Sequence, residues 1–247
     1  PLRVGTRGSP LALWQTREFL GLITRFCPVL RDAKAFEEHA ITTSGDRIQD
    51  RRLAEIGGKG LFAKEIHEAL LDGRVDFAVH SLKDLETELP PGVVLACTLK
   101  REDARDALIL GAGCEAPVDP AHPFDCLPRG ALIGTSSARR QAQLLHARPD
   151  LRIGTMRGNV QTRLAKLHAG EASASLLAIA GLNRLGLDRE ADVVLDPAVM
   201  LPAACQGIVG VTVRAQDAAL CELLSAIEDP RARAVSSAER ALLAALD

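Results

Sequence analysis

Short apolar runs that favour β-strands alternate along this chain with segments of helical periodicity, and this alternation limits the fold more than any other feature. Helical segments separate most of the strand-like runs, and two further helices are expected at about residues 217–227 and 231–246. The strand-like runs lie at residues 2–5, 36–42, 75–79, 93–99, 107–110, 131–134, 151–156, 175–180 and 208–214. Strands interleaved with helices predict an α/β fold with parallel sheets and right-handed crossovers.

Helix starts are marked by small polar residues. Ser9 precedes Pro10, which predicts an N-cap followed by proline at the first helical position. Ser136 or Ser137 caps a second helix, and Asn159 caps a third. Two helices carry expected apolar stripes, formed by Leu11, Trp14, Phe19 and Leu22 in the first and by Leu61, Ile66, Leu70 and Leu71 in the second.

The strands and helices form two successive series. A short charged segment, Lys100-Arg101-Glu102-Asp103, joins the series, and residues 111–130 are predicted to be a loop because glycine and proline cluster near its ends. We therefore expect two lobes.

The composition excludes several kinds of protein. The chain has 247 residues and is 47% hydrophobic, so it can build a core without disulfides or metals. Its six cysteines are scattered, with no CxxC and no zinc-like spacing, which predicts free thiols in a reducing compartment and no metal site. No apolar run approaches the roughly 20 residues that span a membrane. Without a signal-peptide pattern, we expect a cytoplasmic protein with no membrane partner.

Arginine is unevenly distributed. Residues 129–163 contain seven arginines and one acid, Asp150, although the net charge of the chain is −2. Arginine grips carboxylates bidentately, so the cluster favours a ligand rich in carboxylates, although a GC-rich genome also raises the arginine content. Nucleic acid is a poor alternative partner, because aromatic residues are only 3% of the chain and no nucleic-acid motif is present.

The segment His80-Ser81-Leu82-Lys83-Asp84 directly follows a strand-like run. Ligands of open α/β sheets bind at the carboxyl ends of the strands, and a carboxylate beside a cation there can do proton work. The alternative is a solvated turn after a strand. We expect His80 to orient its neighbours, and we expect no metal at this position.

Other polar residues stand at corresponding places, just after strands or at helix starts, where unpaired N–H groups attract anions. They are Arg7, Ser9, Lys59, Thr135, Ser136, Ser137, Arg139, Arg140, Arg157, Gly158, Asn159, Arg163 and Arg184. Each has a plainer interpretation. Arg139 and Arg140 could form a solvated helix face, Arg163 could pair with Glu171, and Asp46 could be a turn residue. Lys59 stands in a glycine-rich loop, but the phosphate-loop motif is absent.

Together these segments resemble the porphobilinogen deaminase family. The matching pieces run in family order over nearly the whole chain. They are residues 3–12, Thr43-Ser44-Gly45-Asp46, Gly57-Gly58-Lys59-Gly60-Leu61-Phe62, His80-Ser81-Leu82-Lys83-Asp84, Arg101-Glu102-Asp103, Gly134-Thr135-Ser136-Ser137 with Arg139-Arg140, Arg157-Gly158-Asn159-Val160, Thr162-Arg163-Leu164, Ala180-Gly181-Leu182 with Arg184, and Gln206-Gly207.

The resemblance implies an α/β protein of three domains. Its first two lobes would resemble type II periplasmic binding proteins, with an active-site cleft between them. The boundaries it implies are residues 1–100 for domain 1, 105–201 for domain 2, 208–225 for a return segment of domain 1, and 226–247 for the start of a truncated α+β domain 3.

The resemblance also implies an activity. Family members condense four porphobilinogen molecules into hydroxymethylbilane with release of ammonia, starting from a dipyrromethane cofactor. By similarity, Asp84 is the catalytic carboxylate, because it stabilises the electron-poor cation left when ammonia departs. Lys59 belongs to a mobile loop near the cleft. Substrate or cofactor carboxylates would be held by Arg7, Ser9, Lys83, Ser137, Arg139, Arg140, Arg157, Arg163 and Arg184, and the family motifs also place Thr135, Ser136, Gly158 and Asn159 at the site.

Three departures from the family pattern matter. The family anchors dipyrromethane on a cysteine soon after an Ala-Glu-Arg helix; here Ala238-Glu239-Arg240 is present and none of the six cysteines follows it. Two interpretations stay open, an incomplete deaminase or a short homologue without the anchor, and activity of the 247 residues is in doubt. Cys205 stands where glycine is usual, and Glu86 replaces a common proline.

The alternative function is a non-catalytic module that binds a pyrrole or another carboxylate ligand. A monomer is expected.

Overall fold

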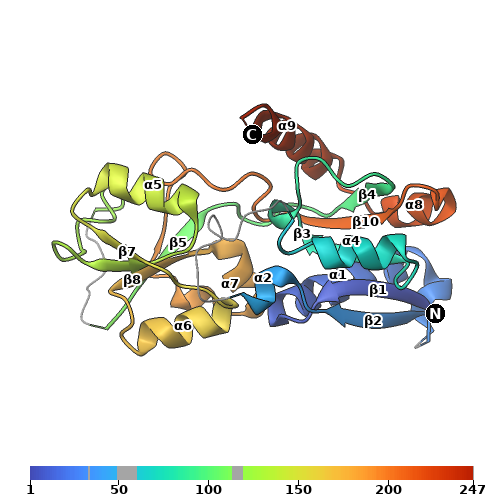
Figure 1. Cartoon of the computed structure of the whole chain (residues 1–247), viewed down its shortest axis with the longest axis horizontal. Helices are drawn as coiled ribbons and strands as arrows, with labels where there is room; N and C mark the ends of the chain where they lie inside the picture. Colours follow the sequence, from blue (N-terminus) through green and yellow to red (C-terminus); the bar gives the residue numbers. More distant parts are fainter. Residues whose placement is uncertain (33, 49–59, 113–118, 247) are drawn as a thin grey trace. The chain divides into compact units, whose positions relative to one another are not determined.

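The computed structural model describes residues 1–32, 34–48, 60–112 and 119–246 (Figure 1). The described residues divide into two compact units. Unit 1 comprises residues 1–47, 60–102 and 204–246, and unit 2 comprises residues 48 and 103–203. The chain leaves unit 1 twice, after residue 47 and after residue 102, and returns to it each time.

Unit 1 is built on a five-stranded sheet in the order β2-β1-β3-β10-β4. Strands β1, β2 and β3 run parallel, and β10 lies antiparallel to both β3 and β4. The strand bounds are β1 Leu2–Arg7, β2 Phe36–Ile41, β3 Phe77–Ser81, β4 Val93–Thr98 and β10 Val209–Arg214.

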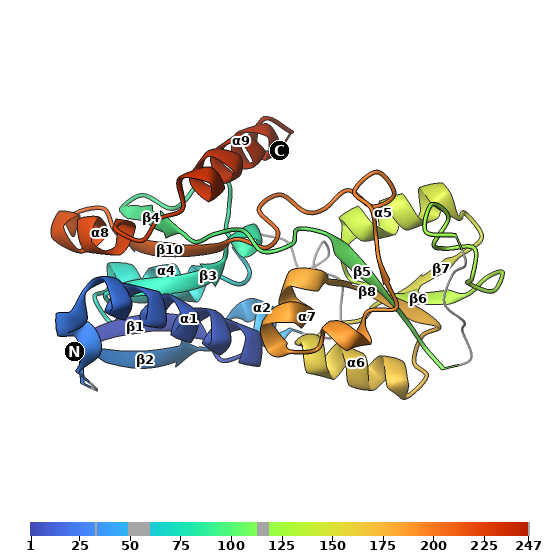
Figure 2. The ribbon, with the colours of Figure 1, turned by 180° about the vertical axis from the view of Figure 1, so that it is seen from behind.

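Two helices cover opposite faces of this sheet, α1 (Pro10–Phe26) and α4 (Lys64–Leu71), as the two views of Figures 1 and 2 show. Phe77 and Val79 of β3 pack in one core cluster with Phe19 of α1, whereas Ala78 packs in another with Ile66 of α4. This alternation follows from the two-residue period of a strand, and it directs His80 to the α4 face. The remaining helical segments of unit 1 are η1 Pro28–Arg31, α2 Ser44–Arg47, η2 Leu82–Asp84, α8 Ala218–Ser225 and α9 Pro230–Leu246.

Unit 2 repeats the plan with a sheet in the order β7-β6-β8-β5-β9. Strands β6, β7 and β8 are parallel, and β5 is antiparallel to β8 and to β9. Leu144 of α5 packs in one core cluster, and Leu167 of α6 packs with Leu182 of α7 in another. The bounds are β5 Asp106–Leu110, β6 Leu132–Gly134, α5 Ala138–Ala147, β7 Arg152–Gly154, α6 Val160–His168, β8 Ala174–Ala178, α7 Ile179–Leu185, η3 Asp188–Glu190 and β9 Val193–Val194.

The prediction of an α/β fold is confirmed, but the expectation of parallel sheets is wrong, since both sheets are mixed. Periodicity marks where strands occur, but it says nothing about the direction in which a later segment enters a sheet. Two stripe residues were also misplaced: Trp14 is 36% exposed and Leu71 is 47% exposed. Among the described residues no helix is long and apolar enough to cross a membrane. The expected start of a third domain at residue 226 stays a prediction.

Candidate functional site

The carboxyl ends of β1, β2 and β3 meet at one edge of the unit 1 sheet, because these strands are parallel neighbours. Arg7 ends β1, the turn that contains Asp46 follows β2, and Lys83 and Asp84 follow β3. The antiparallel strand β10 begins at the same edge, with Val209 opposite Ser81. Gln206, three residues before the start of β10, therefore also lies at this edge, where its side-chain oxygen accepts a hydrogen bond from Lys83 Nζ (3.2 Å).

Arg7 is the centre of this edge. Its Nε lies 3.2 and 3.3 Å from the two carboxylate oxygens of Asp46, and its Nη2 donates to Asp46 as well. Arg7 Nη1 lies 3.7 Å from Asp84 Oδ2, and the guanidinium stands over the ring of Phe62 at 4.3 Å. Arg7 was predicted to hold ligand carboxylates; here it also holds two carboxylates of the protein.

Asp46 was missed as a site residue because its carboxylate also makes the local hydrogen bonds that are typical of an aspartate in a turn. Its carboxylate accepts hydrogen bonds from the backbone N–H of Thr43 (3.2 Å) and from the Thr43 hydroxyl (2.8 Å). Burial raises the pKa of Asp46, but the hydrogen bonds and charge of Arg7 and the bonds from Thr43 outweigh burial and leave the pKa below 3.8. Asp46 is thus held as a carboxylate that orients Arg7.

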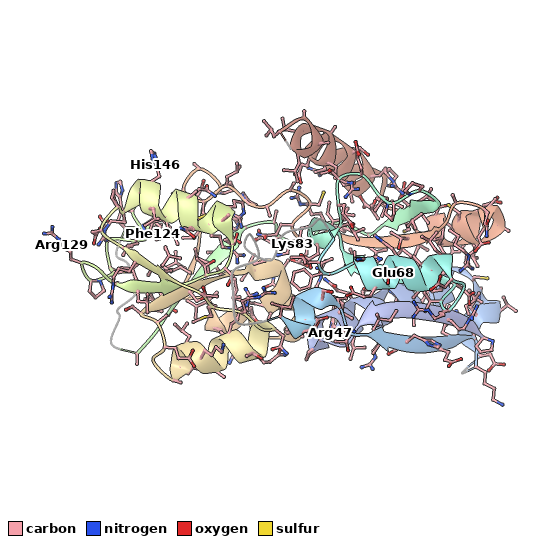
Figure 3. All side chains as sticks on the ribbon, viewed as in Figure 1. Arg47, Glu68, Lys83, Phe124, Arg129 and His146 are labelled. Atoms are coloured by element: carbon pink, nitrogen blue, oxygen red, sulfur yellow. The ribbon has the colours of Figure 1, made fainter. Side chains whose placement is uncertain are left out.

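Asp84 lies in the short 3₁₀ turn η2, with a side chain that is 28% exposed. Lys83, labelled in Figure 3, is exposed next to it. Ser9 is confirmed as the N-cap of α1, where its hydroxyl accepts from the N–H of Ala12 (3.3 Å). Lys59 lies outside the described residues.

His80 is buried and its Nε2 lies 2.9 Å from the Thr212 hydroxyl. Burial, then His67 and Arg7, lower the pKa of His80 to about 3, so the imidazole is uncharged near neutral pH. Within the described ranges, no group of three or more His, Cys, Asp or Glu side chains could hold a metal ion.

The edge of unit 2 has the same topology. The carboxyl ends of parallel β6, β7 and β8 meet there, and the antiparallel β5 begins there, with Asp106 opposite Ala178. Asp106 is fully buried between Arg139 Nη2 and Arg140 Nη2, each 2.7 Å from one carboxylate oxygen. Sequence reasoning missed Asp106, because the residue opens a strand and gives no motif of its own.

The two arginines differ in their surroundings. Arg140 is buried and also donates Nη1 to the backbone oxygen of Leu176 (2.9 Å), while its Nε is a buried donor without a hydrogen-bond partner. Arg139 keeps 24% of its side chain exposed and donates to the backbone oxygen of Leu201. Burial lowers the pKa of Arg139, while Asp106 raises it. The interpretation of both residues as a solvated helix face is wrong for Arg140.

The β6–α5 turn carries three predicted hydroxyl residues. Ser137 is the N-cap of α5 and accepts from the N–H of Arg140 (3.4 Å). Ser136 donates to the Met156 carbonyl (3.1 Å), and Thr135 is buried with its hydroxyl accepting from the N–H of Ser137 (3.2 Å). These bonds fix the start of α5 and so the direction in which Arg139 and Arg140 leave it.

The β7–α6 turn is fixed in a similar way. Asn159 caps α6 and accepts from the Thr162 N–H (2.8 Å) and hydroxyl (2.9 Å). Gly158 has φ 112°, and a Cβ there would lie 2.7 Å from the Thr162 methyl, so only glycine fits. Arg157 is 4% exposed, and Arg163 Nε donates to the Gly158 carbonyl (2.9 Å), whereas a surface pair with Glu171 had been the alternative.

Not all of the predicted basic segment reaches this edge. Arg148 pairs with Asp150 at 2.8 Å, and the labelled side chains of Arg129 and His146 project outward from unit 2 in Figure 3. Arg184 lies on α7 and is half-buried. Arg140 and Arg157 combine burial with a place at the carboxyl ends of β6, β7 and β8, and the partly exposed Arg139 lies there as well.

Known proteins match this chain along its length. A family model described as "Porphobilinogen deaminase, dipyromethane cofactor binding domain" matches residues 2–222. A porphobilinogen deaminase of Caulobacter vibrioides (strain NA1000 / CB15N) is 52% identical over 253 residues, covering 100% of this chain and 76% of the relative. The chloroplastic porphobilinogen deaminase of Oryza sativa subsp. japonica is 46% identical over 246 residues, covering 100% of this chain and 66% of that protein.

Solved structures resemble the fold at low sequence identity. A VFT2 domain of Bordetella pertussis BvgS, a double mutant, gives a TM-score of 0.51 at 16% identity and covers 96% of this chain and 91% of that one. An ABC transporter periplasmic binding protein from Brucella ovis gives 0.50 at 16% identity, covering 90% and 65%. The two-lobed fold of the periplasmic-binding-protein type is confirmed.

Proposed function

The chain belongs to the porphobilinogen deaminase family, whose members are transferases of haem biosynthesis, and we propose from this premise that it joins four porphobilinogen molecules head-to-tail into hydroxymethylbilane. The observation that carries the proposal is the Arg7–Asp84 pair at the carboxyl end of the unit 1 sheet, since a carboxylate held beside a cation suits chemistry on a charged pyrrole.

The cofactor of the family is dipyrromethane, and the residues of unit 2 fit such a group. Each of its pyrroles carries an acetate and a propionate, so it needs several cationic donors. Arg139, Arg140 and Arg157 supply them, and the partnerless buried Nε–H of Arg140 is a donor without an acceptor. When bound, dipyrromethane supplies the pyrrole carbon to which the first substrate is joined. Arg163 and Arg184, with the capped starts of α5 and α6 at Ser137 and Asn159, extend this donor set.

Asp84 has the catalytic role in the proposal. The carbon–nitrogen bond of the substrate's aminomethyl group breaks, ammonia leaves with the electron pair, and an electron-poor cation is left on that substrate. The Asp84 carboxylate stabilises this cation and accepts a hydrogen bond from the pyrrole N–H, while Arg7 fixes the orientation of the carboxylate. The free α-carbon of the neighbouring pyrrole attacks this cation and forms a carbon–carbon bond, and the attacking carbon then loses its proton, which leaves with the released ammonia as ammonium.

The surrounding residues position these groups. Asp46 holds Arg7, and Gln206 holds Lys83, so that Lys83 and Ser9 stand ready for substrate carboxylates. We assign no anchoring role to any of the six cysteines; by the family resemblance the cofactor is anchored on a cysteine that follows an Ala-Glu-Arg segment such as Ala238-Glu239-Arg240. We also propose a monomer in the cytoplasm; the described cysteines are free thiols, which suits a reducing compartment.

The decisive test substitutes Asp84→Asn in a version extended through a cysteine after the Ala238-Glu239-Arg240 segment. Ammonia release and uroporphyrin after acid oxidation are measured. Calorimetry measures the binding of a dipyrrole tetracarboxylate, in which each of two linked pyrroles carries an acetate and a propionate. Asp84→Asn should lower turnover by about 10²–10⁴-fold and leave binding unchanged, because it removes charge stabilisation and proton handling without altering shape.

Asp72→Asn is the matched control, since Asp72 is a carboxylate of the same unit whose side chain is 64% exposed. Its turnover should equal that of the parent. If the parent binds the tetracarboxylate but releases no ammonia, the function is that of a binding module and the proposed activity is wrong. The 247-residue chain run in parallel tests whether turnover depends on the added cysteine.

A further inference from the structure

Three of the buried side-chain atoms that lack a hydrogen-bond partner in the described part of the chain lie together in unit 1. They are Nδ1 and Nε2 of His67, on α4, and Oε2 of Glu86, two residues after Asp84. The His67 side chain is 3% exposed and that of Glu86 12% exposed, with 3.9 Å between Nδ1 and Oε2. A buried polar atom that stays unpaired is costly, so a pair of them facing each other calls for an explanation.

The carboxylate of Glu86 is also fitted against the chain that leads into α4. A Cβ placed on Gly60 would lie 1.8 Å from Glu86 Oε1, so the carboxylate fills the space that the missing side chain leaves. Gly60 has φ 76°, and its carbonyl accepts from the N–H groups of Ala63 and Lys64 at the beginning of α4. Glu86 therefore contacts both the entry to α4 and an imidazole on α4.

The backbone around Glu86 is held from a third side. Arg240 of α9 donates Nη2 to the carbonyl of Glu86 (2.6 Å) and to the carbonyl of Thr87 (2.9 Å). Leu85, which links Asp84 to Glu86, is buried, and its N–H donates to the Leu82 carbonyl (3.2 Å). The turn that carries Lys83 and Asp84 is thus tied down on its downstream side by contacts that converge on Glu86.

The titratable and charged groups facing this pair can be named. His80 of β3 lies with its ring 5.7 Å from that of His67, and Arg7 of β1 acts on His80; Arg240 of α9 lies behind Glu86. His80 is uncharged near neutral pH, so it does not balance the carboxylate. Burial lowers the pKa of His67 and Glu86 raises it, with a net value below 6.5.

We propose that His67 and Glu86 form a hydrogen-bonded pair that fixes the Lys83–Asp84 turn against α4, which makes both of them positioning residues for the Asp84 carboxylate. Neutral His67 donates its Nδ1–H to Glu86 Oε2, and a side-chain shift of about 1 Å closes the present distance to the normal range. The role assigned to Asp84 rests on the proposed function; the pair itself does not.

The first test follows the His67 imidazole by NMR as a function of pH. Glu86→Gln should lower the pKa of His67 by about one unit, because the carboxylate that favours the charged imidazole is gone. The matched control is Glu68→Gln, one residue from His67 on α4 and exposed, labelled in Figure 3; it should leave the titration unchanged. Equal titration curves in parent, Glu86→Gln and Glu68→Gln would overturn the pair, whether or not the protein proves to be a deaminase.

The second test asks what the pair does for turnover in the extended version. Glu86→Gln and His67→Gln should each lower kcat about tenfold at unchanged KM, and the double variant should be no worse than either, as expected for residues that act as one unit. Additive losses, or an equal rise in KM, would refute the positioning role. If the parent shows no turnover, the proposed function fails, and the NMR titration still decides whether the pair exists.

Discussion

The two sheets of this protein share one plan and differ in charge. In each, three parallel strands are followed by one strand antiparallel to both of its neighbours and by an edge strand that runs in the direction of the first three, in the orders β2-β1-β3-β10-β4 and β7-β6-β8-β5-β9. The edge of unit 1 carries the cations Arg7 and Lys83 and the carboxylates Asp46 and Asp84, so the signs balance, and Arg7 pairs with both carboxylates. The edge of unit 2 is strongly cationic, because the acid described there is Asp106 and the basic residues are Arg139, Arg140, Arg157 and Arg163.

The difference teaches that topology decides where polar groups collect, and the side chains decide what that place can do. An edge with balanced charges keeps a carboxylate ionised beside a cation, an arrangement that suits charge stabilisation and proton handling during a reaction. A cationic edge suits the holding of anions. Asp106 is the most buried of the charged groups named at the edge of unit 2, and it orients two arginines at once, so it belongs to the architecture of that edge.

The largest effect should come from removing that acid. Asp106→Asn leaves two guanidinium groups short of a partner, and one of them is buried, so the free energy of unfolding should fall by about 3–5 kcal/mol. Asp46→Asn in unit 1 should cost only about 1 kcal/mol, because Asp46 and Arg7 are partly exposed. Urea unfolding of both variants measures the two losses in free energy of unfolding, and equal losses would contradict the expected difference between the two edges.

The next effect concerns ligand affinity. Arg139→Gln should weaken binding of a dipyrrole tetracarboxylate by about 10- to 100-fold, because charge-assisted hydrogen bonds to the ligand are lost. Arg129→Gln, an exposed arginine of the same basic segment, should bind normally. Calorimetry at two salt concentrations provides the measurement, with a melting curve for each variant to exclude unfolding. Equal losses in both variants would mean that the whole segment, and not the edge, attracts the ligand.

A smaller effect should appear in acid. The pKa of Asp46 is lowered in the folded protein, so its ionised form contributes stability that is present above its unfolded pKa and is lost as pH falls through its folded pKa. The stability difference between parent and Asp46→Asn should therefore be constant near neutral pH and shrink below about pH 4. Urea midpoints from pH 7 to pH 2.5 measure it; a difference that grew on acidification would contradict the assigned sign.

The smallest effect is expected in the segment that returns to the unit 1 edge. Cys205 has φ 61°, a left-handed conformation that costs a residue with a Cβ about 1–2 kcal/mol. Cys205→Gly relieves this strain but adds unfolded-state entropy, so we expect a net gain of about 0.5 kcal/mol. Cys205→Ala keeps the strain and loses the buried thiol, whose Sγ lies 3.8 Å from the Ser236 carbonyl, and should be less stable. Thermal melts that rank the two variants in reverse would refute the strain.

Much of the local structure could be predicted from the sequence. Ser9, Asn159 and either Ser136 or Ser137 were expected as N-caps, and Ser9, Ser137 and Asn159 each accept a hydrogen bond from the first turn of their helix. These predictions hold because capping depends on residues three positions apart. The ends of strands could be placed as well, which is why polar residues such as Arg7 and Asp84 were assigned to the sheet edges.

What the sequence could not provide are the partners of these residues. Asp46 looked like a turn residue, Asp106 lay just before a predicted strand and carried no motif, and the pairing of His67 with Glu86 had no local signal at all. Each of these contacts joins segments that are distant along the chain. Such pairings appear only when the strands are set side by side, so propensity and spacing carry no information about them.

The sequence by itself thus determined the alternation of strands and helices, the helix starts and the family, because these depend on neighbouring residues and on motif order. Tertiary structure alone decided that β5 and β10 enter their sheets antiparallel, and with that it brought Asp106 to Arg139 and Gln206 to Lys83. The physical reason is that strand direction and long-range ion pairs depend on how the whole chain packs, and each is settled by contacts that no local window of sequence contains.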